Sequence, residues 1–492
     1  MGTVLEEAAP APSSRRRDLL WLPATATVAA VTGCLVTQAF FLRVVLALIA
    51  AGALVIFAVA IPRAVIYGLI VWLFCLGLLR RLVGTIGPGG PLDPLLVVGP
   101  VVLITLVVST TARSSFRDRT PLANLVLAMS AVLVLSAFNP LQGGPLVGLA
   151  GLLFTVVPML AFWIGRAAAD DHLVRGVLKL YAGLSIVAAA YGLYQTFIGF
   201  PVWDQRWILQ GGYAALNVGG VIRAFGTSSS ASEYAFLLGV GLVAWFTLTP
   251  RRLLALPALG LLGCAIFYES SRGIIFGLAL TLALLAGVRR RVPFPLALAA
   301  AVAAVVGVIW FAGRMLPAPD NGHSTTALTE HQLGGLADPF NPETSTLMLH
   351  LGYFWSGFVS GFTNPIGHGV GTISIAGAKF GGTSQATELD PSNMAVAAGL
   401  PGLALYLCLA GTGFRGAYKA AMLGHDRLAL CVFGVLVAMA FQWLNGGQYS
   451  VAILPWFLLG WLDRQGAERS GPTDAHTQRS PEITVPGTSS CL

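Results

Sequence analysis

Charge is what this sequence has least of. Charged residues make up only 10% of the 492 residues, whereas soluble domains carry about 25%. Hydrophobic residues account for 56% of the chain. This composition excludes a soluble globular protein and predicts an all-α polytopic membrane protein.

Cysteines and paired histidines are also scarce. The six cysteines lack metal-ligand spacing, and none lies in the one long polar stretch, residues 313–390. We therefore expect no disulfide framework. The seven histidines include no HxxxH or HExxH pair. The sequence thus predicts no protein-built metal site, and we expect no cofactor.

Long apolar runs dominate the rest of the chain. A membrane-spanning helix needs about 20 mostly apolar residues, and counting such runs predicts about 14 transmembrane helices. Their approximate extents are 19–38, 44–62, 64–82, 91–111, 120–138, 145–165, 173–198, 229–249, 252–269, 271–288, 292–312, 391–412, 428–444 and 447–462.

The polar segments complete this organisation. Residues 1–18 form a predicted disordered arm, and residues 463–492 form a predicted disordered tail. Eleven predicted helices fill residues 19–312, and three fill residues 391–462. Between them, residues 313–390 form a large loop that we expect to be partly helical.

The distribution of basic residues predicts the orientation. With both termini in the cytoplasm, 21 basic residues fall inside and eight outside, so the positive-inside rule favours this topology over its inverse. The large loop is then extracytoplasmic, and the chain belongs in the cytoplasmic (inner) membrane. The net charge of +8 reflects arginine-rich inner loops, so we expect no nucleic-acid partner. The outer eight are Arg43, Arg80, Arg81, Arg206, Arg223, Arg272, Arg314 and Lys379.

Two of these outer arginines are candidates for binding an anionic group. Arg223 follows a polar loop and precedes Gly226 and three serines, where the backbone can approach a ligand closely. Arg272 lies between two apolar runs, where a charge is costly and usually functional or paired. Together they could clamp a pyrophosphate bidentately. Alternatively, Arg223 extends to lipid head groups and Arg272 pairs with Glu269.

Several acidic and amide residues could orient or activate a substrate. Glu233 lies in the first turns of a predicted helix and either neutralises an arginine or binds substrate. Asp390 and Asn393 lie where the chain re-enters the membrane after the large loop. Asp390 either caps that helix or acts as a general base, a role for which Glu388 competes. Arg206, in the outer loop 200–228, is a further candidate for substrate binding.

The large loop contains a predicted amphipathic helix and two candidate histidines. Asn341-Pro342 is typical of a helix start, and Phe362-Thr363-Asn364-Pro365 is expected to end the helix. Four apolar residues then share one face, at spacings of four, three and four: Leu347, Leu351, Phe354 and Phe358. His350 lies roughly opposite that face, and His368 lies in a glycine-rich turn. Each is either a surface residue or a catalytic one.

Four stretches together resemble the O-antigen ligase and polymerase family of membrane glycosyltransferases. The resemblance covers roughly residues 173–462. The stretches are Arg223-Ala224-Phe225-Gly226, Ser271-Arg272-Gly273, Asn364-Pro365-Ile366-Gly367-His368-Gly369-Val370-Gly371, and Asn393 followed by Gly399-Leu400-Pro401-Gly402-Leu403.

The resemblance implies an activity, partners and residue roles. Family members transfer a glycan from a polyprenyl-pyrophosphate carrier to a glycan or glycolipid acceptor at the outer face of the membrane. Arg223 and Arg272 would bind the pyrophosphate and stabilise its developing charge. The acceptor hydroxyl would attack the anomeric carbon, and neither a nucleotide sugar nor a metal would be needed.

One departure from the family leaves the general base open. Ligases of the family commonly carry a histidine just before the asparagine at the end of the large loop, but this chain reads Glu388-Leu389-Asp390-Pro391-Ser392-Asn393. A carboxylate takes the role, or His350 or His368 does, or the mechanism relies on positioning. Other hypotheses are a transporter or flippase of lipid-linked glycan and a scaffold subunit. The sequence leaves ligase and polymerase open.

Overall fold

The computed structural model describes residues 39–86, 93–111, 119–211, 217–218, 221–250, 252–315, 324–343, 345–385, 387, 389–424 and 426–470. The described residues are almost entirely helical, as predicted, and contain one antiparallel pair of two-residue strands, β1 (Asn217–Val218) and β2 (Val221–Ile222). The predicted first span, the N-terminal arm and Glu388 lie outside the described residues, as does the tail beyond residue 470.

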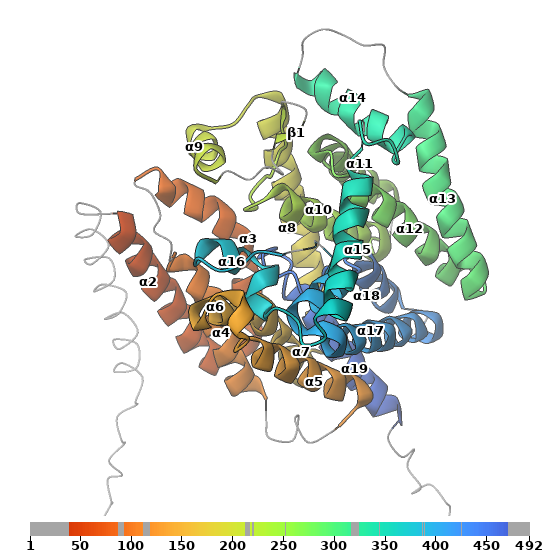
Figure 1. Cartoon of the computed structure of the whole chain (residues 1–492). Coiled ribbons are helices and arrows are strands. Elements are labelled where there is room, and N and C mark those ends of the chain that lie inside the picture. Colours follow the sequence, from red (N-terminus) through yellow and green to blue (C-terminus); the bar gives the residue numbers. More distant parts are fainter. Residues whose placement is uncertain are drawn as a thin grey trace, which may run out of the picture.

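The helices follow one another with short connections in most of the chain (Figure 1). Their bounds are α2 Ala39–Ala60, α3 Pro62–Gly84, α4 Leu95–Thr110, α5 Pro121–Ser136, η2 Pro140–Gln142, α6 Pro145–Met159, α7 Ala161–Ala168, α8 Asp171–Phe197, α9 Val202–Gly211, α10 Ala231–Leu248, α11 Arg252–Glu269, α12 Arg272–Arg289, α13 Phe294–Arg314, α14 Ser324–Ala337, α15 Leu347–Thr363, η4 Val370–Ile373, α16 Ile375–Lys379, α17 Asp390–Gly424, α18 Arg427–Ala438 and α19 Leu454–Ser470.

Eight of the described helical segments are long and apolar enough to cross a membrane, so the chain is a multi-pass membrane protein. They are α2, α3, the α6–α7 pair, α8, α10, α12, α13 and α17. Four shorter apolar helices, α4, α5, α11 and α18, coincide with predicted spans but have 17 residues or fewer in their apolar part. The count of fourteen therefore remains a prediction.

The last helix differs most from its predicted segment. We predicted a span over residues 447–462 followed by a disordered tail, but α19 begins at Leu454 and continues to Ser470. The ion pair between Arg464 and Glu468, one helical turn apart at 2.8 Å, stabilises this extension. The polar side chain of Gln465 also donates to Asp171, at 2.7 Å.

Ion pairs gather at two ends of the helix bundle. At the first end, three arginines predicted to be cytoplasmic pair with carboxylates from connections predicted on that same side: Arg63 with Asp170 at 2.8 Å, Arg166 with Asp463 at 3.0 Å, and Arg175 with Asp426 at 3.5 Å. At the second end, four arginines predicted to be outside pair with carboxylates predicted on that side: Arg43 and Arg80 with Asp93 at 2.8 and 2.7 Å, Arg81 with Asp204 at 3.1 Å, and Arg223 with Glu269. These described ion pairs fall into the two sets of connections that the charge pattern distinguishes, and the orientation of the chain remains a prediction.

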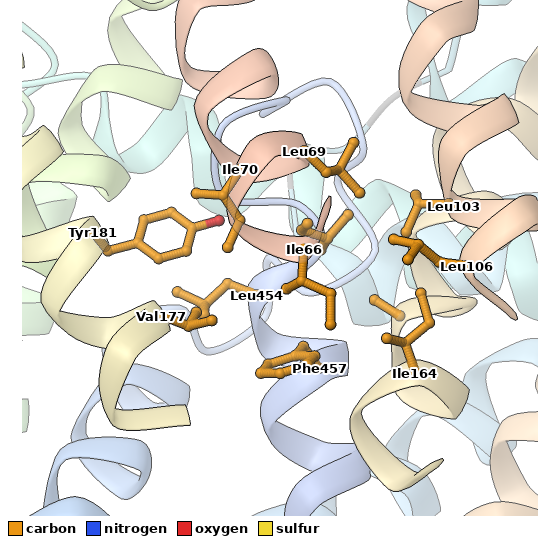
Figure 2. A pocket seen from close by; sticks show the side chains of 12 residues that line it. Ile66, Leu69, Ile70, Leu103, Leu106, Ile164, Val177, Tyr181, Leu454 and Phe457 are labelled. Atoms are coloured by element: carbon orange, nitrogen blue, oxygen red, sulfur yellow. The ribbon is translucent and has the colours of Figure 1, made fainter. Parts of the chain in front are cut away.

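The interior of the bundle is packed with apolar side chains. A gap with a volume of about 300 Å³ lies between α3, α4, α7, α8 and α19. Figure 2 shows the side chains that line it. Its lining is aliphatic and aromatic, and Tyr181 supplies the one hydroxyl that the view labels. Because Tyr181 donates to the Ser450 carbonyl at 2.8 Å, that hydroxyl is already used. A charged ligand would be poorly solvated in this gap, so the site must be sought at the polar ends.

The amphipathic helix of the large loop begins later than predicted. α15 starts at Leu347, whereas Asn341 caps a preceding turn, in which its Oδ1 accepts from the backbone N–H of Glu343 at 3.0 Å. An asparagine followed by proline serves a turn as well as a helix start, which explains the error. The predicted end at residues 362–365 is confirmed, because the helix ends at Thr363.

The predicted apolar face of α15 is only partly buried, because Leu347, Phe354 and Phe358 have intermediate exposure and Leu351 is 44% exposed. The fully buried residues of the helix are Gly357 and Gly361, which lie directly against α17. The large side chains of Trp355 and Phe362 are 69% and 66% exposed. Helices in membranes approach closely through small residues and turn large apolar ones to lipid. The face of bulky residues therefore suits a lipid environment better than the protein core.

Two glycine-containing stretches that the sequence singled out pack on each other. α17 is broken at Ala398–Gly399, where Gly399 has φ +63° and ψ −150°. Across this break, the N–H of Leu400 donates to the Pro365 carbonyl at 3.1 Å, and the N–H of His368 donates to the Val396 carbonyl at 2.7 Å. The glycines thus allow the large loop to lie directly against the kinked helix.

Gly399→Ala is expected to destabilise this contact. A Cβ atom at residue 399 would lie 1.9 Å from the Pro365 carbonyl oxygen, and the backbone conformation is one that residues with a Cβ avoid. We expect a loss of about 1–3 kcal/mol or more from the free energy of unfolding. Denaturation of the purified protein in detergent measures it. Gly411→Ala, on the same helix with open space around the glycine, is the control and should be nearly neutral.

Candidate functional site

Arg223 is positioned by the short strand pair and by a buried glutamate. It directly follows β2, and its Nε donates to the Glu269 carbonyl at 2.9 Å. Its Nη2 forms an ion pair with the Glu269 carboxylate. That carboxylate is fully buried, and its Oε2 also accepts from the N–H of Ser271 at 2.9 Å. Glu269 therefore joins Arg223 to the turn between α11 and α12.

Arg272 starts α12 and is held by the large loop. Its Nη2 lies 2.7 Å from His331 Nε2 and 2.7 Å from the His331 carbonyl oxygen, both on α14. The guanidinium also lies flat against Gly335, because a Cβ there would come within 1.9 Å of Arg272 Cζ. A guanidinium can only donate, so Nε2 of His331 is the acceptor and the imidazole carries its proton on Nδ1.

Both arginines act electrostatically on His331. Burial, then the neighbouring charges of Arg272 and Arg223, lower the pKa of His331 from 6.5 to about 4. The imidazole is therefore neutral at physiological pH. Arg272 is thus half-buried between two neutral acceptors, and among the described residues it forms no ion pair with a carboxylate. This group of Arg223, Glu269, Arg272 and His331 has one net positive charge.

Acidification is expected to destabilise this group. The unfolded chain binds the His331 proton near pH 6.5 and the folded chain near pH 4, so stability falls as the pH drops through that window and levels off below it. Relative to His331→Gln, the wild-type melting temperature should fall by about 2–4 °C from pH 7 to pH 4, the effect of roughly 1 kcal/mol after discounting for solvent screening. Melting curves of both proteins test this, and parallel pH profiles would contradict it.

Glu233 is fully enclosed and binds backbone groups. Its two carboxylate oxygens accept from the N–H of Ser229 at 2.9 Å and from the N–H of Ser450 at 2.7 Å. Ser230 caps the helix by accepting from the Glu233 N–H at 3.2 Å. Glu233 therefore joins the loop that follows Arg223 to the connection before α19. With 1% exposure it is placed to support the site rather than to contact a substrate.

Arg81, for which the sequence suggested no role, anchors the other side of the same loop. It is fully buried, pairs with Asp204 at 3.1 Å, and its Nη2 donates to the Gly226 carbonyl at 2.7 Å. Its guanidinium also lies over the Phe225 ring, at 4.7 Å. Gln195 completes the anchor, since its Oε1 accepts from the Gly226 N–H at 2.7 Å. The buried polar network of Arg81, Asp204 and Gln195 thus fixes the loop that presents Arg223.

Asp390 and Asn393 form a second group, at the start of α17. The Oδ2 of Asp390 accepts from the Tyr406 hydroxyl and from the N–H of Leu444, both at 3.0 Å. The Oδ1 of Asn393 accepts from the N–H of Thr387 at 2.7 Å. Both residues are buried and hold the end of the large loop against neighbouring segments. Their contacts are with α17 and its surroundings, whereas Arg223 and Arg272 contact α11 and α14.

The two candidate histidines are also placed by the large loop. His350 is exposed on α15, with its Nε2 3.1 Å from the Thr346 hydroxyl. His368 is partly buried in the glycine-rich turn, with its Nδ1 3.4 Å from the Ser360 hydroxyl. Their described contacts are with these hydroxyl groups of the large loop rather than with Arg223 or Arg272. A general-base role for either remains a prediction.

Arg206 lies apart from the Arg223 group. It is exposed on α9, and its Nη1 donates to the Thr85 carbonyl at 2.7 Å. His331, by contrast, contacts Arg272 directly and was not singled out from the sequence. No pattern in the sequence around a single histidine in a polar loop predicts that it will contact an arginine 59 residues away. Only the packing of α14 onto the start of α12 reveals it.

Comparison with known proteins does not assign this site. The chain matches no known protein-family description, and no curated protein is similar to it. Within the described part of the chain, no group of three or more histidine, cysteine, aspartate or glutamate residues is arranged to hold a metal ion. The chemistry of the site therefore has to be argued from its arginines.

Proposed function

We propose that this membrane protein transfers or polymerises a glycan carried on a polyprenyl pyrophosphate, at the outer face of the cytoplasmic membrane. The proposal includes the fourteen-span topology with both termini in the cytoplasm. The observation that carries it is the Arg272 guanidinium, half-buried between neutral groups of His331 and next to Arg223. Such a cation attracts an anion that can accept from it, and a pyrophosphate has the required charge and oxygens.

The arginines would act most strongly on the leaving group. The acceptor hydroxyl forms a new bond to the anomeric carbon, and the bond from that carbon to the pyrophosphate oxygen breaks. The electron pair remains on that oxygen, and the hydroxyl proton goes to a general base. Fixed donors stabilise charge where it grows, so Arg272 and Arg223 lower the barrier to departure. Asp390, His350 and His368 remain the described candidates for the base.

The ion pair with Glu269 has a clear role in this mechanism. It holds the Arg223 guanidinium in one orientation before substrate arrives, which reduces the cost of organising the site. It also removes one of the two positive charges, so that the empty site is not self-repelling. Arg272, whose described partners are neutral, then supplies the attraction for the anion.

Reconstitution tests the function directly. The purified protein in lipid vesicles is given a lipid-linked oligosaccharide with an acceptor, and the products are sized. A ladder of products identifies a polymerase, and a single added glycan identifies a ligase. Movement of the lipid-linked glycan across the vesicle without a new bond would contradict the proposal and identify a flippase.

A further inference from the structure

A second group of arginines lines a cleft that the proposed reaction does not use. The cleft has a volume of about 500 Å³ and lies between the ends of α2 and α3 and the short helix α9. Its lining includes Arg43, Arg80, Asp93, Trp203, Arg206 and Trp207. The cleft adjoins the loop that presents Arg223, because Arg81, which lines the cleft, donates to the carbonyl of Gly226 in that loop.

Positive charge is in excess in this cleft. Arg43 and Arg80 share a single carboxylate oxygen, Asp93 Oδ2, at 2.8 and 2.7 Å. Arg206 donates to a backbone carbonyl rather than to a carboxylate. Four arginines and the single carboxylate of Asp93 therefore line the cleft, and one of the four, Arg81, also pairs with Asp204. Lys379 lies close by, and burial followed by the charge of Arg80 lowers the pKa of its amine.

Part of this charge is buried and incompletely bonded. Arg43 is 4% exposed, and its Nε has no hydrogen-bond partner within the described part of the chain. Leaving a buried charged donor unbonded is costly. An oxyanion in the cleft would supply both the missing acceptor and the missing negative charge. Arginine forks match the oxygens of a phosphate particularly well.

The two indoles of the cleft are held in fixed orientations. Trp203 donates to the Tyr191 hydroxyl at 2.8 Å, and Trp207 donates to the Ser229 carbonyl at 3.2 Å. Arg80 lies over the Trp207 ring at 5.0 Å, which places a cation between the aromatic wall and Asp93. Tryptophan beside arginine is typical of the zone where protein meets lipid head groups.

The position of the cleft favours a ligand that comes from the bilayer. α2, which contributes Arg43, is only 22% buried over its apolar window, and it lies at the edge of the bundle in Figure 1. A lipid beside α2 can therefore place its head group in the cleft while its chains stay in the membrane. Basic pockets between membrane helices bind phosphorylated head groups in this way.

We infer that this cleft binds the phosphate of an anionic membrane lipid. The two sources of that chemistry are an anionic phospholipid and a polyprenyl phosphate. Binding here does not depend on the proposed glycan transfer, because none of the lining residues belongs to the Arg223 group.

Native mass spectrometry of the purified full-length protein tests this inference. The protein is offered phosphatidylglycerol and phosphatidylcholine with identical chains, and in a separate arm polyprenyl phosphate. We expect retention of the anionic lipid over phosphatidylcholine. Arg206→Gln and Arg80→Gln should each reduce that retention about tenfold, the effect of one charge-assisted hydrogen bond. Stronger retention of polyprenyl phosphate than of phosphatidylglycerol identifies the carrier lipid, and equal retention identifies anionic lipids in general.

Arg63→Gln is the matched control, because it removes an exposed arginine from the other end of α3. It should leave lipid retention unchanged, and Arg272→Ala should leave the retention of phosphatidylglycerol over phosphatidylcholine unchanged. Because Arg206 is exposed, its variant is expected to fold even if Arg80→Gln does not. Equal retention of both phospholipids with no retention of polyprenyl phosphate would overturn the inference, and so would an unchanged preference in both cleft variants. Retention of an acidic oligosaccharide but of neither anionic lipid would also overturn it.

Discussion

Arg272→Ala should reduce the rate of glycan transfer about 100- to 1,000-fold, the usual effect of removing one fixed donor from a developing oxyanion. Arg272 is held by His331 and flattened against Gly335, so its position does not depend on substrate. The measurement is the initial rate of product formation from a lipid-linked oligosaccharide by the reconstituted variant.

Arg289→Ala is the matched control, because it removes an exposed arginine from the other end of the same helix. It should transfer glycan at the wild-type rate.

Arg223 needs a different variant, since its removal leaves Glu269 buried without its cation. Arg223→Met combined with Glu269→Gln removes both charges and should lose activity while remaining folded. Full activity in Arg272→Ala and in this double variant would exclude the pyrophosphate site.

Arg81→Met should lower the free energy of unfolding by about 3–5 kcal/mol, because it leaves the buried carboxylate of Asp204 without its cation. Arg81 and Asp204 are both fully buried in the structure, so water cannot replace the missing charge. The loss of the bond to Gly226 should also loosen the loop that presents Arg223. Chemical denaturation in detergent micelles measures the first effect.

The double variant Arg81→Met, Asp204→Asn separates the two causes of the lost stability, namely the unpaired charge of Asp204 and the changed shape of the side chain at residue 81. The amide oxygen of the asparagine can still accept from Tyr191 or Gln195, which now donate to Asp204 at 2.7 Å each. The double variant should therefore recover much of the lost stability. Arg63→Met, which removes an exposed arginine from the other end of α3, should change stability by no more than about 0.5 kcal/mol. A loss from Arg81→Met no larger than from Arg63→Met would show that the buried pair is not structural.

Helix positions were the most predictable part of the fold. Apolar runs in membrane proteins form helices because a helix bonds its own backbone groups. Each predicted segment within the described residues therefore overlaps a helix, although the last does so only from Leu454 onward. Helix ends were less predictable, as Asn341 and the extension of α19 to Ser470 show. These ends depend on caps and side-chain pairs, which compete with several alternatives of similar energy.

The candidate site was predicted only in part. Arg223 was singled out because it precedes a glycine and three serines, and Arg272 because a charge between two apolar runs is costly. The structure brings both arginines near His331. Asp390 and Glu233 were singled out at the starts of predicted helices, but their carboxylates accept hydrogen bonds from backbone N–H groups. The sequence shows that a polar group lies at the membrane edge and does not show which partner satisfies it.

Composition and charge pattern by themselves determined that this is a helical multi-pass membrane protein, because apolar length and arginine placement act locally on each segment. Only the tertiary structure decided which arginines form buried ion pairs and which, like Arg272, meet neutral groups among the described residues. Arg81 meets Gly226 across 145 residues, and Arg272 meets His331 across 59. Such contacts form when separate helices pack, and the energy of a buried charge depends on the partner that packing supplies.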